Sequence, residues 1–356
     1  MRGREAAIRG VFATRLIEWQ QRFGRGDLPW QGTREPYRVW LSEVMLQQTQ
    51  VQTVIPYYQR FLARFPDVVA LSKATLDEVL GLWSGLGYYA RARSLHAAAR
   101  VVAACGGYFP SSAEELARLP GVGRSTAAAI AVFAFGERAA ILDGNVKRVL
   151  CRIFAVHGVP GQAAVDKRLW ELAESLVPEH SVEQYTQGLM DLGATLCVRS
   201  SPRCSQCPFT GFCEAERLGI HDRFPERARK PPLPERRTVM LVALHDGKVL
   251  LEKRPLTGVW GGLWSLPEYA SFAAAARACA ARAGTPAGPP RKLVPLAHRF
   301  THFGLTIRPI VCRVAERVSV MEEPRLAWID VEQAVAGSVP APVRVLLKRV
   351  QILGSC

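Results

Sequence analysis

Four cysteines past the middle of the chain limit its fold more than any other feature of the sequence. Cys197, Cys204, Cys207 and Cys213 follow the spacing C-x6-C-x2-C-x5-C within 17 residues. Four thiolates this close in sequence are typical ligands of a [4Fe–4S] cluster or of a tetrahedral zinc ion. Structural zinc sites usually contain two short cysteine knuckles and this segment has one, but residue type alone leaves both metals open. Four unrelated buried thiols are the remaining alternative, and the rarity of cysteine argues against them.

The N-terminal segment bears on the compartment in which these cysteines act. It is rich in arginine, but it lacks the apolar core and small-residue cleavage site of a secretory signal. Glu5 and Glu18 argue against a transit peptide, and the apolar spacing predicts an amphipathic helix instead. Because disulfides are rare in reducing compartments, we expect a cytoplasmic protein whose clustered cysteines bind a metal.

The charge balance indicates an acidic partner. The chain has 356 residues with 46 Lys and Arg against 31 Asp and Glu, a formal net charge of +15. This surplus favours nucleic acid or an anionic lipid surface as the partner, although charge alone does not define a fold. Apolar residues make up 49% of the chain, which excludes a disordered protein, and no uncharged apolar run reaches the roughly 20 residues needed to cross a bilayer.

The sequence changes character near residue 222. Residues 1–222 show helix-period apolar patterns broken by Gly, Pro and Ser turns, which predicts an all-α domain. Residues 223–237 are rich in proline and basic residues and are interpreted as a linker. In residues 238–356, strand patterns at 238–244, 248–254 and 305–314 and helix patterns at 272–283 and 342–353 predict a separate α+β domain.

A glycine-containing turn between two predicted helices is a candidate phosphate site. In the run Leu119-Pro-Gly-Val-Gly-Arg-Ser-Thr126, Gly121 and Gly123 allow positive φ and close backbone approach. The helix that follows presents unpaired amide groups to an anion, and this geometry holds DNA phosphates without reading the bases. A simple interhelical turn is the alternative, and Arg124 together with the basic total favours phosphate binding.

Two acidic residues lie in unusual surroundings. Glu43 is flanked by Val39, Trp40, Val44 and other apolar residues on a predicted helix, so it is either a desolvated proton donor or a glutamate that reaches solvent. Asp143 precedes a predicted helix, and it is both a natural N-cap and a candidate fixed anion. A proton donor and a fixed anion are what glycosidic cleavage requires, but the sequence does not show that the two residues meet.

Together these motifs resemble the helix-hairpin-helix DNA glycosylases that carry an iron–sulfur cluster, and most closely the MutY-type adenine DNA glycosylases. The resemblance spans nearly the whole chain and rests on LPWQ (28–31), SEVMLQQTQV (42–51), GLGYYARAR (85–93), LPGVGRSTA (119–127), ILDGNVKRV (141–149) and the cysteine set. It implies that the metal is a [4Fe–4S] cluster. It also implies removal of adenine mispaired with 8-oxoguanine or G, by hydrolysis of the N-glycosidic bond after the base leaves the duplex.

The resemblance also implies roles for individual residues. Glu43 would protonate adenine at N7, and Asp143 would stabilise the positive sugar. Residues expected to line the adenine pocket are Trp30, Gln31 and Gln187, where both glutamines replace charged residues of some relatives. Residues expected to contact DNA are Gln48 and Tyr88, as wedges in the base stack, and Gly121, Gly123, Arg124 and Ser125 of the hairpin. The partner would be double-stranded DNA, bound by a monomer and, in a bacterium, at the nucleoid.

The C-terminal domain resembles the Nudix fold through residues 250–269. A working Nudix hydrolase needs a glutamate-rich helix to hold Mg²⁺, and here that stretch is FAAAARACAARA, without an acidic residue. We therefore expect a reader domain without hydrolase activity. Phe300, Thr301 and His302 match the loop that reads 8-oxoguanine, in which serine usually occupies the middle position.

Two other functions remain as alternatives. An endonuclease-III-type pyrimidine glycosylase shares the hairpin and the cluster, but it has a lysine nucleophile where this chain has Ser125. A hydroxyl cannot form the imine, so we expect a monofunctional glycosylase without efficient strand cleavage. The second alternative is a protein that binds DNA with the same elements and has no catalytic activity.

Overall fold

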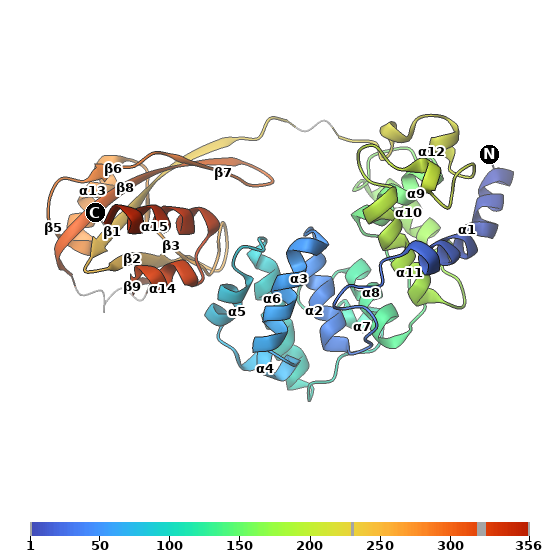
Figure 1. Cartoon of the computed structure of the whole chain (residues 1–356), viewed down its shortest axis with the longest axis horizontal. Coiled ribbons are helices and arrows are strands. Elements are labelled where there is room, and N and C mark those ends of the chain that lie inside the picture. The colour runs from blue at the N-terminus through green and yellow to red at the C-terminus, as the bar shows by residue number, and fades with distance from the viewer. Residues whose placement is uncertain (1, 229–230, 319–324, 355–356) are drawn as a thin grey trace. The chain divides into compact units, whose positions relative to one another are not determined.

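The computed structural model describes residues 2–228, 231–318 and 325–354. The chain folds into two compact units (Figure 1). The first unit contains residues 1–72 and 97–230, and the second unit contains residues 73–96 and 231–356. None of the helices in the described ranges is long and apolar enough to span a membrane.

The first unit is helical throughout, as the sequence predicts for residues 1–222, although residues 73–96 of that range belong to the second unit. Its α-helices are α1 (Arg2–Phe23), α2 (Pro36–Leu46), α3 (Val51–Arg64), α4 (Val68–Lys73), the end of α6 (Tyr89–Ala104), α7 (Ala113–Leu116), α8 (Arg124–Phe135), α9 (Gly144–Ile153), α10 (Ala163–Leu176), α11 (Val182–Asp191) and α12 (Glu214–Arg217). A π-helical turn, η1 (Leu192–Leu196), continues α11, and two 3₁₀ turns, η2 (Cys204–Gln206) and η3 (His221–Arg223), lie near α12.

One hydrophobic core of this unit joins its N-terminal helix to helices from the middle of the chain. Phe12 of α1, Leu150 of α9 and Tyr185 of α11 are among its buried side chains, and α1 packs along α11. The predicted amphipathic stripe of the N-terminal segment is confirmed, because Ile8, Phe12 and Leu16 are all buried. This core holds α8, α9 and α11 as a fixed frame for the side chains described below.

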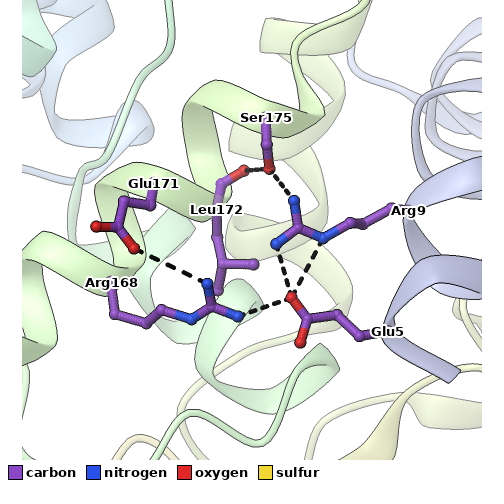
Figure 2. Close-up of polar contacts among 6 residues, drawn as sticks. All are labelled: Glu5, Arg9, Arg168, Glu171, Leu172 and Ser175. Carbon is purple, nitrogen blue, oxygen red and sulfur yellow. Dashed lines mark hydrogen bonds and ion pairs between the residues drawn. The ribbon is translucent and has the colours of Figure 1, made fainter. Parts of the chain in front are cut away.

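A charged network joins α1 to α10 at the border of this core (Figure 2). Glu5 accepts hydrogen bonds from Arg9 and Arg168, and Arg9 also donates to the hydroxyl of Ser175 at 2.6 Å. The bond from Arg9 is the main cause that lowers the pKa of Glu5. These side chains are partly exposed, so the network is expected to orient the two helices more than to stabilise the fold.

The second unit combines α5 (Leu76–Trp83) and the start of α6 with a mixed β-sheet. Its strands are β1 (Glu235–His245), β2 (Lys248–Lys253), β3 (Trp264–Ser265), β4 (Glu268–Tyr269), β5 (Gly284–Pro286), β6 (Arg291–Lys292), β7 (Leu296–Arg299), β8 (Gly304–Arg317) and β9 (Leu326–Asp330). Its remaining helices are α13 (Phe272–Ala278), the π turn η4 (Cys279–Ala283), α14 (Val331–Ala336) and α15 (Ala341–Gly354).

The sheet is built around two long parallel strands. Its main order is β3-β2-β1-β8-β5, and β1 pairs with β8 in parallel from Glu235 opposite Gly304 to Leu244 opposite Arg313. Residues 238–243 of β1 are buried on both faces, which explains why this strand is a continuous apolar run without alternation. The predicted strands at 238–244, 248–254 and 305–314 and the predicted helix at 342–353 are therefore confirmed. The predicted helix at 272–283 is α13 followed by η4.

Candidate active site

A cavity of about 350 Å³ in the helical unit collects most of the predicted pocket residues. Trp30 and Gln31 reach it from the loop between α1 and α2, Glu43 from α2, and Gln187 from α11. Trp30 is buried and packs edge-on against Tyr58, with ring centroids 5.4 Å apart. These four residues are more than 150 positions apart at the extremes, so only the helical packing brings them together.

Glu43 points from a buried helix into this cavity. Helix α2 begins where Glu35 accepts hydrogen bonds from the N–H groups of Tyr37 and Arg38, with Pro36 in its first turn. Val44 and Met45, which follow Glu43 on α2, are buried. Burial raises the pKa of Glu43 from 4.5 to about 8, and the nearby carboxylate of Asp143 adds to this shift. A carboxyl group in this state holds a proton at neutral pH.

Asp143 is the N-cap of α9, and the charge of its carboxylate also contributes to the raised pKa of Glu43. Its Oδ1 accepts a hydrogen bond from the N–H of Val146 at 2.7 Å. Burial raises the pKa of Asp143, while the backbone N–H groups of Val146 and Asn145 and the charge of Arg148 oppose the shift. The cap and the fixed anion are thus compatible uses of one carboxylate, because the capping bonds also hold it in place.

The two glutamines of the cavity have their amide groups partly committed. Gln187 donates through Nε2 to Oδ1 of Asp191 at 2.8 Å, and fully buried Asp191 is also bound by the backbone N–H and the guanidinium of Arg25. Gln31 accepts through Oε1 from the N–H of Leu28 at 3.2 Å. These bonds use one of the two N–H groups of Gln187 and one of the two lone pairs of the Gln31 carbonyl, so the Gln187 carbonyl and the Gln31 amino group keep their full hydrogen-bonding capacity. The sequence prediction missed Arg25 and Asp191, and their pairing carries no local sequence signal.

The predicted hairpin forms as a tight turn that leads into α8. Gly121 has φ +77°, where a side chain would be strained, while Gly123 is the extended N-cap of α8 with φ −86°. A Cβ at Gly123 would meet no protein atom within 4 Å. Arg124 lies over the ring of Trp170 at 3.8 Å and pairs with Glu174, so a phosphate would compete with partners of the same chain.

Ser125 has a structural partner that its sequence position does not reveal. Its Oγ accepts a hydrogen bond from the backbone N–H of Leu142 at 2.9 Å. Leu142 directly precedes Asp143, so the hydroxyl ties the first turn of α8 to the N-cap of α9.

The four cysteines of the predicted cluster line one small cavity next to α9. Cys197, Cys204, Cys207 and Cys213 share it with apolar side chains such as Phe209. Arg152 of α9 is buried and reaches Sγ of Cys197 at 3.4 Å, and Cys213 bonds back to the carbonyl of Arg152 at 3.3 Å. No three His, Cys, Asp or Glu side chains of the described ranges are placed to hold one metal ion. Four thiols around one small, mostly apolar cavity are a donor set that an iron–sulfur cluster can use.

The structure also links the cysteine loop to the start of α9. Arg148 donates to the carbonyl of Gly193 at 2.6 Å, to the carbonyl of Cys197 at 2.8 Å and to the side chain of Asn145. Gly193 is required at this crossing, because a Cβ there would lie 2.7 Å from Cβ of Asn145.

The two predicted wedge residues, Gln48 of the first unit and Tyr88 of the second, both have a positive φ angle. Gln48 follows α2 with φ +56°, and Tyr88 precedes α6 with φ +50°. Both side chains are exposed, Tyr88 by 43% of its surface. Positive φ is uncommon for residues other than glycine and marks backbone strain that often lies at functional sites.

The predicted reader loop connects β7 to β8 in the second unit. The ring of Phe300 stacks on Phe303 at 4.4 Å and lies 5.5 Å from Trp260, while Thr301 and His302 are exposed. The hydroxyl of Thr301 contacts Nδ1 of His302 at 3.3 Å. The sequence prediction missed Trp260, whose ring packs against Phe300 although it lies 40 residues earlier in the chain. The backbone of Trp260 has a positive φ of +55°.

Comparisons with known proteins show similarity over both the helical and the C-terminal parts of the chain. The HhH-GPD superfamily of base excision DNA repair proteins matches residues 41–175, and the NUDIX domain matches residues 238–349. The adenine DNA glycosylase of Buchnera aphidicola (from Acyrthosiphon pisum) is 33% identical, covering 95% of this chain and 97% of its own, and that of Homo sapiens is 34% identical, covering 96% and 74%. A thermostable thymine-DNA glycosylase structure is 31% identical with a TM-score of 0.54, covering 60% of this chain and 99% of its own. An endonuclease III–DNA complex, 22% identical with a TM-score of 0.51, covers 60% and 98% and shares the fold.

Proposed function

Because the chain belongs to the family of adenine DNA glycosylases, we propose that it releases adenine from DNA by hydrolysing the N-glycosidic bond in base excision repair. The observation that carries this function is Glu43, a carboxyl group whose pKa is raised to about 8, in a cavity lined by Trp30 and two amide side chains. A protonated acid at neutral pH is the group that makes adenine a better leaving group.

The reaction uses the two carboxyl groups in different ways. Once adenine leaves the duplex and enters the cavity, Glu43 gives its proton to N7, and the bond to the sugar weakens. The sugar then develops oxocarbenium character, and the Asp143 carboxylate stabilises that positive charge and directs the incoming water. The capping bond from Val146 keeps this carboxylate in one position while the charge develops.

The committed amide groups suggest which adenine atoms are read. Adenine carries an exocyclic amino donor and ring-nitrogen acceptors. The Gln187 carbonyl, turned by the bond from its Nε2 to Asp191, accepts from the exocyclic amino group. The Gln31 carbonyl accepts from the N–H of Leu28, which orients the amide so that its amino group donates to a ring nitrogen of adenine. This pair rejects a base with a carbonyl in place of the amino group, because two acceptors would then face each other.

The DNA-binding elements have separate tasks. The hairpin around Gly121 and Gly123 holds a phosphate with the amide groups of the first turn of α8, where Arg124 adds charge and Ser125 supports the backbone. Gln48 and Tyr88 enter the base stack and fill the space that the departing adenine leaves. The protein acts as a monomer on double-stranded DNA.

The cysteine loop is proposed to hold a [4Fe–4S] cluster through Cys197, Cys204, Cys207 and Cys213. When bound, the cluster supplies four covalent attachments that shape the loop at residues 197–213. The buried Arg152 compensates the negative charge of the thiolates and ties the loop to α9. The free thiols that such a cluster requires imply a cytoplasmic location, at the nucleoid in a bacterium.

The C-terminal domain is proposed to read 8-oxoguanine opposite the adenine. Phe300 offers a stacked aromatic face, and the exposed Thr301 and His302 offer hydrogen-bonding groups beside it. Helix α13 lacks the glutamates that hold Mg²⁺ in a Nudix hydrolase, so the domain binds the lesion without hydrolysing nucleotides. The preferred substrate is therefore 8-oxoguanine:A, with G:A as a second substrate.

Single-turnover cleavage of an 8-oxoguanine:A duplex tests this function. We expect strand breaks only after alkali, because a monofunctional glycosylase leaves an intact abasic site, and no adduct is expected in borohydride. Glu43→Gln should abolish base release and retain mismatch binding, whereas the control Glu18→Gln, on an exposed position of α1, should behave as wild type. Unchanged turnover by Glu43→Gln, or abundant borohydride-trapped enzyme, would contradict the proposal.

A further inference from the structure

Within the second unit, residues 73–96 of the helical region bind the C-terminal domain through polar contacts. Ser84, which ends α5, donates to the carbonyl of Val339 at 3.0 Å and accepts from Nη2 of Arg344 at 2.8 Å. Arg93 of α6 donates to the carbonyl of Gly261 at 2.8 Å, and Lys253 pairs with Asp77. The partners are separated by 168 to 260 residues in sequence, so these bonds are tertiary.

The packing at this contact is close. Ser84 is 7% exposed although its hydroxyl is polar, and its two bonds to the C-terminal domain satisfy it. Gly262 has φ +80°, and a Cβ there would lie 3.3 Å from Cδ1 of Leu80. Arg344 also donates to the carbonyl of Gly337 at 2.9 Å, so its guanidinium bridges α15, the loop before α15 and the end of α5.

The same segment carries the strained residue Tyr88. Between the two contact points, Gly85, Gly87 and Tyr88 all have positive φ. Inside the segment, Trp83 donates to the carbonyl of Gly87 at 3.0 Å, and the guanidinium of Arg91 lies 5.3 Å from the ring centroid of Trp83 and 5.4 Å from that of Tyr88. A loop in this conformation keeps it only where its surroundings hold it. Here Ser84 is anchored at one end and Arg93 at the other.

We propose that the C-terminal domain positions the Tyr88 loop (residues 84–93) through the hydrogen bonds of Ser84 with Arg344 and Val339. The domain that reads the lesion would then also fix the position of Tyr88, the residue that enters the base stack. Arg344 and Ser84 are then positioning residues that act through Tyr88. This inference rests on the proposed function for the role of Tyr88 in DNA, but the anchoring itself does not depend on catalysis.

Hydrogen–deuterium exchange on the full-length protein without DNA tests the anchoring. In Arg344→Met and Ser84→Ala we expect the amides of residues 84–93 to exchange about tenfold faster, with the β1 and β8 amides unchanged. Arg344→Lys, which keeps a donor, should exchange at an intermediate rate. Arg349→Met, also on α15, is the matched control. Wild-type exchange at residues 84–93 in both variants would overturn the proposal, as would a general rise across the C-terminal domain, which indicates unfolding.

DNA binding tests the action through Tyr88. Arg344→Met should weaken binding to an 8-oxoguanine:A duplex by about tenfold, and it should have no further effect in a Tyr88→Ala background. Additive losses in the double variant would show that Arg344 does not act through Tyr88 and would overturn the proposal. If the wild-type protein releases no adenine at all, the proposed function fails, while the exchange result still decides the anchoring.

Discussion

The hydroxyl of Ser125 accepts a hydrogen bond from the backbone N–H of Leu142 at 2.9 Å, and this bond joins the hairpin that we propose binds DNA to the residue before Asp143. Helix α8, which we propose binds a phosphate, thereby contacts the turn that presents the Asp143 carboxylate at the start of α9. The bond therefore links the position of the hairpin to that of the N-cap of α9.

Removal of this hydroxyl should reduce both stability and rate. In Ser125→Ala the N–H of Leu142 loses its acceptor in a partly buried place, which is expected to cost about 1–2 kcal/mol of unfolding free energy. Adenine release should slow about tenfold as Asp143 loses its fixed position. Thermal unfolding and single-turnover rates measure the two effects. The control is Ser72→Ala on α4, whose hydroxyl donates to the carbonyl of Val69 in its own turn; equal behaviour of the two variants would contradict this role.

The activity should depend on pH through both carboxyl groups. Glu43 has its pKa raised to about 8, so its proton is present below that pH and lost above it, and the rate should fall about tenfold per pH unit on the alkaline side. Asp143 must be ionised, and burial raises its pKa, so the rate should also fall on the acid side at a pH above that of an ordinary aspartate. Single-turnover rates across pH measure both limbs. A flat profile through pH 8 would exclude Glu43 as the acid.

The same shift makes a prediction about stability. A glutamate whose pKa is raised from 4.5 to about 8 favours the folded state below pH 4.5, and this advantage disappears as the pH rises through 8. Glu43→Gln cannot lose a proton, so its midpoint of thermal unfolding should exceed that of the wild type at pH 8 by more than at pH 5. If the difference between the two unfolding midpoints is the same at both pH values, then folding does not raise the pKa of Glu43, and the prediction is wrong.

Discrimination of the lesion should depend on the hydroxyl of Thr301. Thr301→Val keeps the shape of the side chain and removes the group next to Nδ1 of His302. Binding to an 8-oxoguanine:A duplex should weaken about fivefold to tenfold, while binding to G:A should change little. Titrations at one fixed salt concentration measure this, because phosphate contacts dominate the affinity. Thr285→Val, on β5 of the same domain, is the control, and equal losses on both duplexes would assign Thr301 a purely structural role.

Loss of a proposed cluster ligand should disorganise the loop beside α9. Cys204→Ser is expected to reduce the iron content and the midpoint of thermal unfolding, because the loop at residues 197–213 then lacks one of its four attachments. Cys105→Ser changes an exposed cysteine far from the set in sequence and should retain full iron content. Iron analysis and thermal unfolding report the result. Full iron content in Cys204→Ser would remove this residue from the ligand set.

Local motifs were predictable because their information lies within a few neighbouring residues. The cysteine spacing, the turn at Gly121, the capping position of Asp143 and the continuous apolar run of β1 each follow from local backbone and burial rules. The amphipathic N-terminal helix and the strand pair at residues 238–254 follow in the same way from periodicity.

Relations between distant residues required the folded chain. The sequence could not show that Glu43 and Asp143 interact, that Asp191 orients Gln187, or that Ser84 bonds to the carbonyl of Val339, 255 residues away. A pKa near 8, a committed amide and an anchored loop are all produced by neighbours that tertiary packing supplies. The sequence by itself determined which chemical groups this protein carries, and the tertiary structure decided which of them act on one another, because desolvation and hydrogen bonding depend on distance in space and not on separation along the chain.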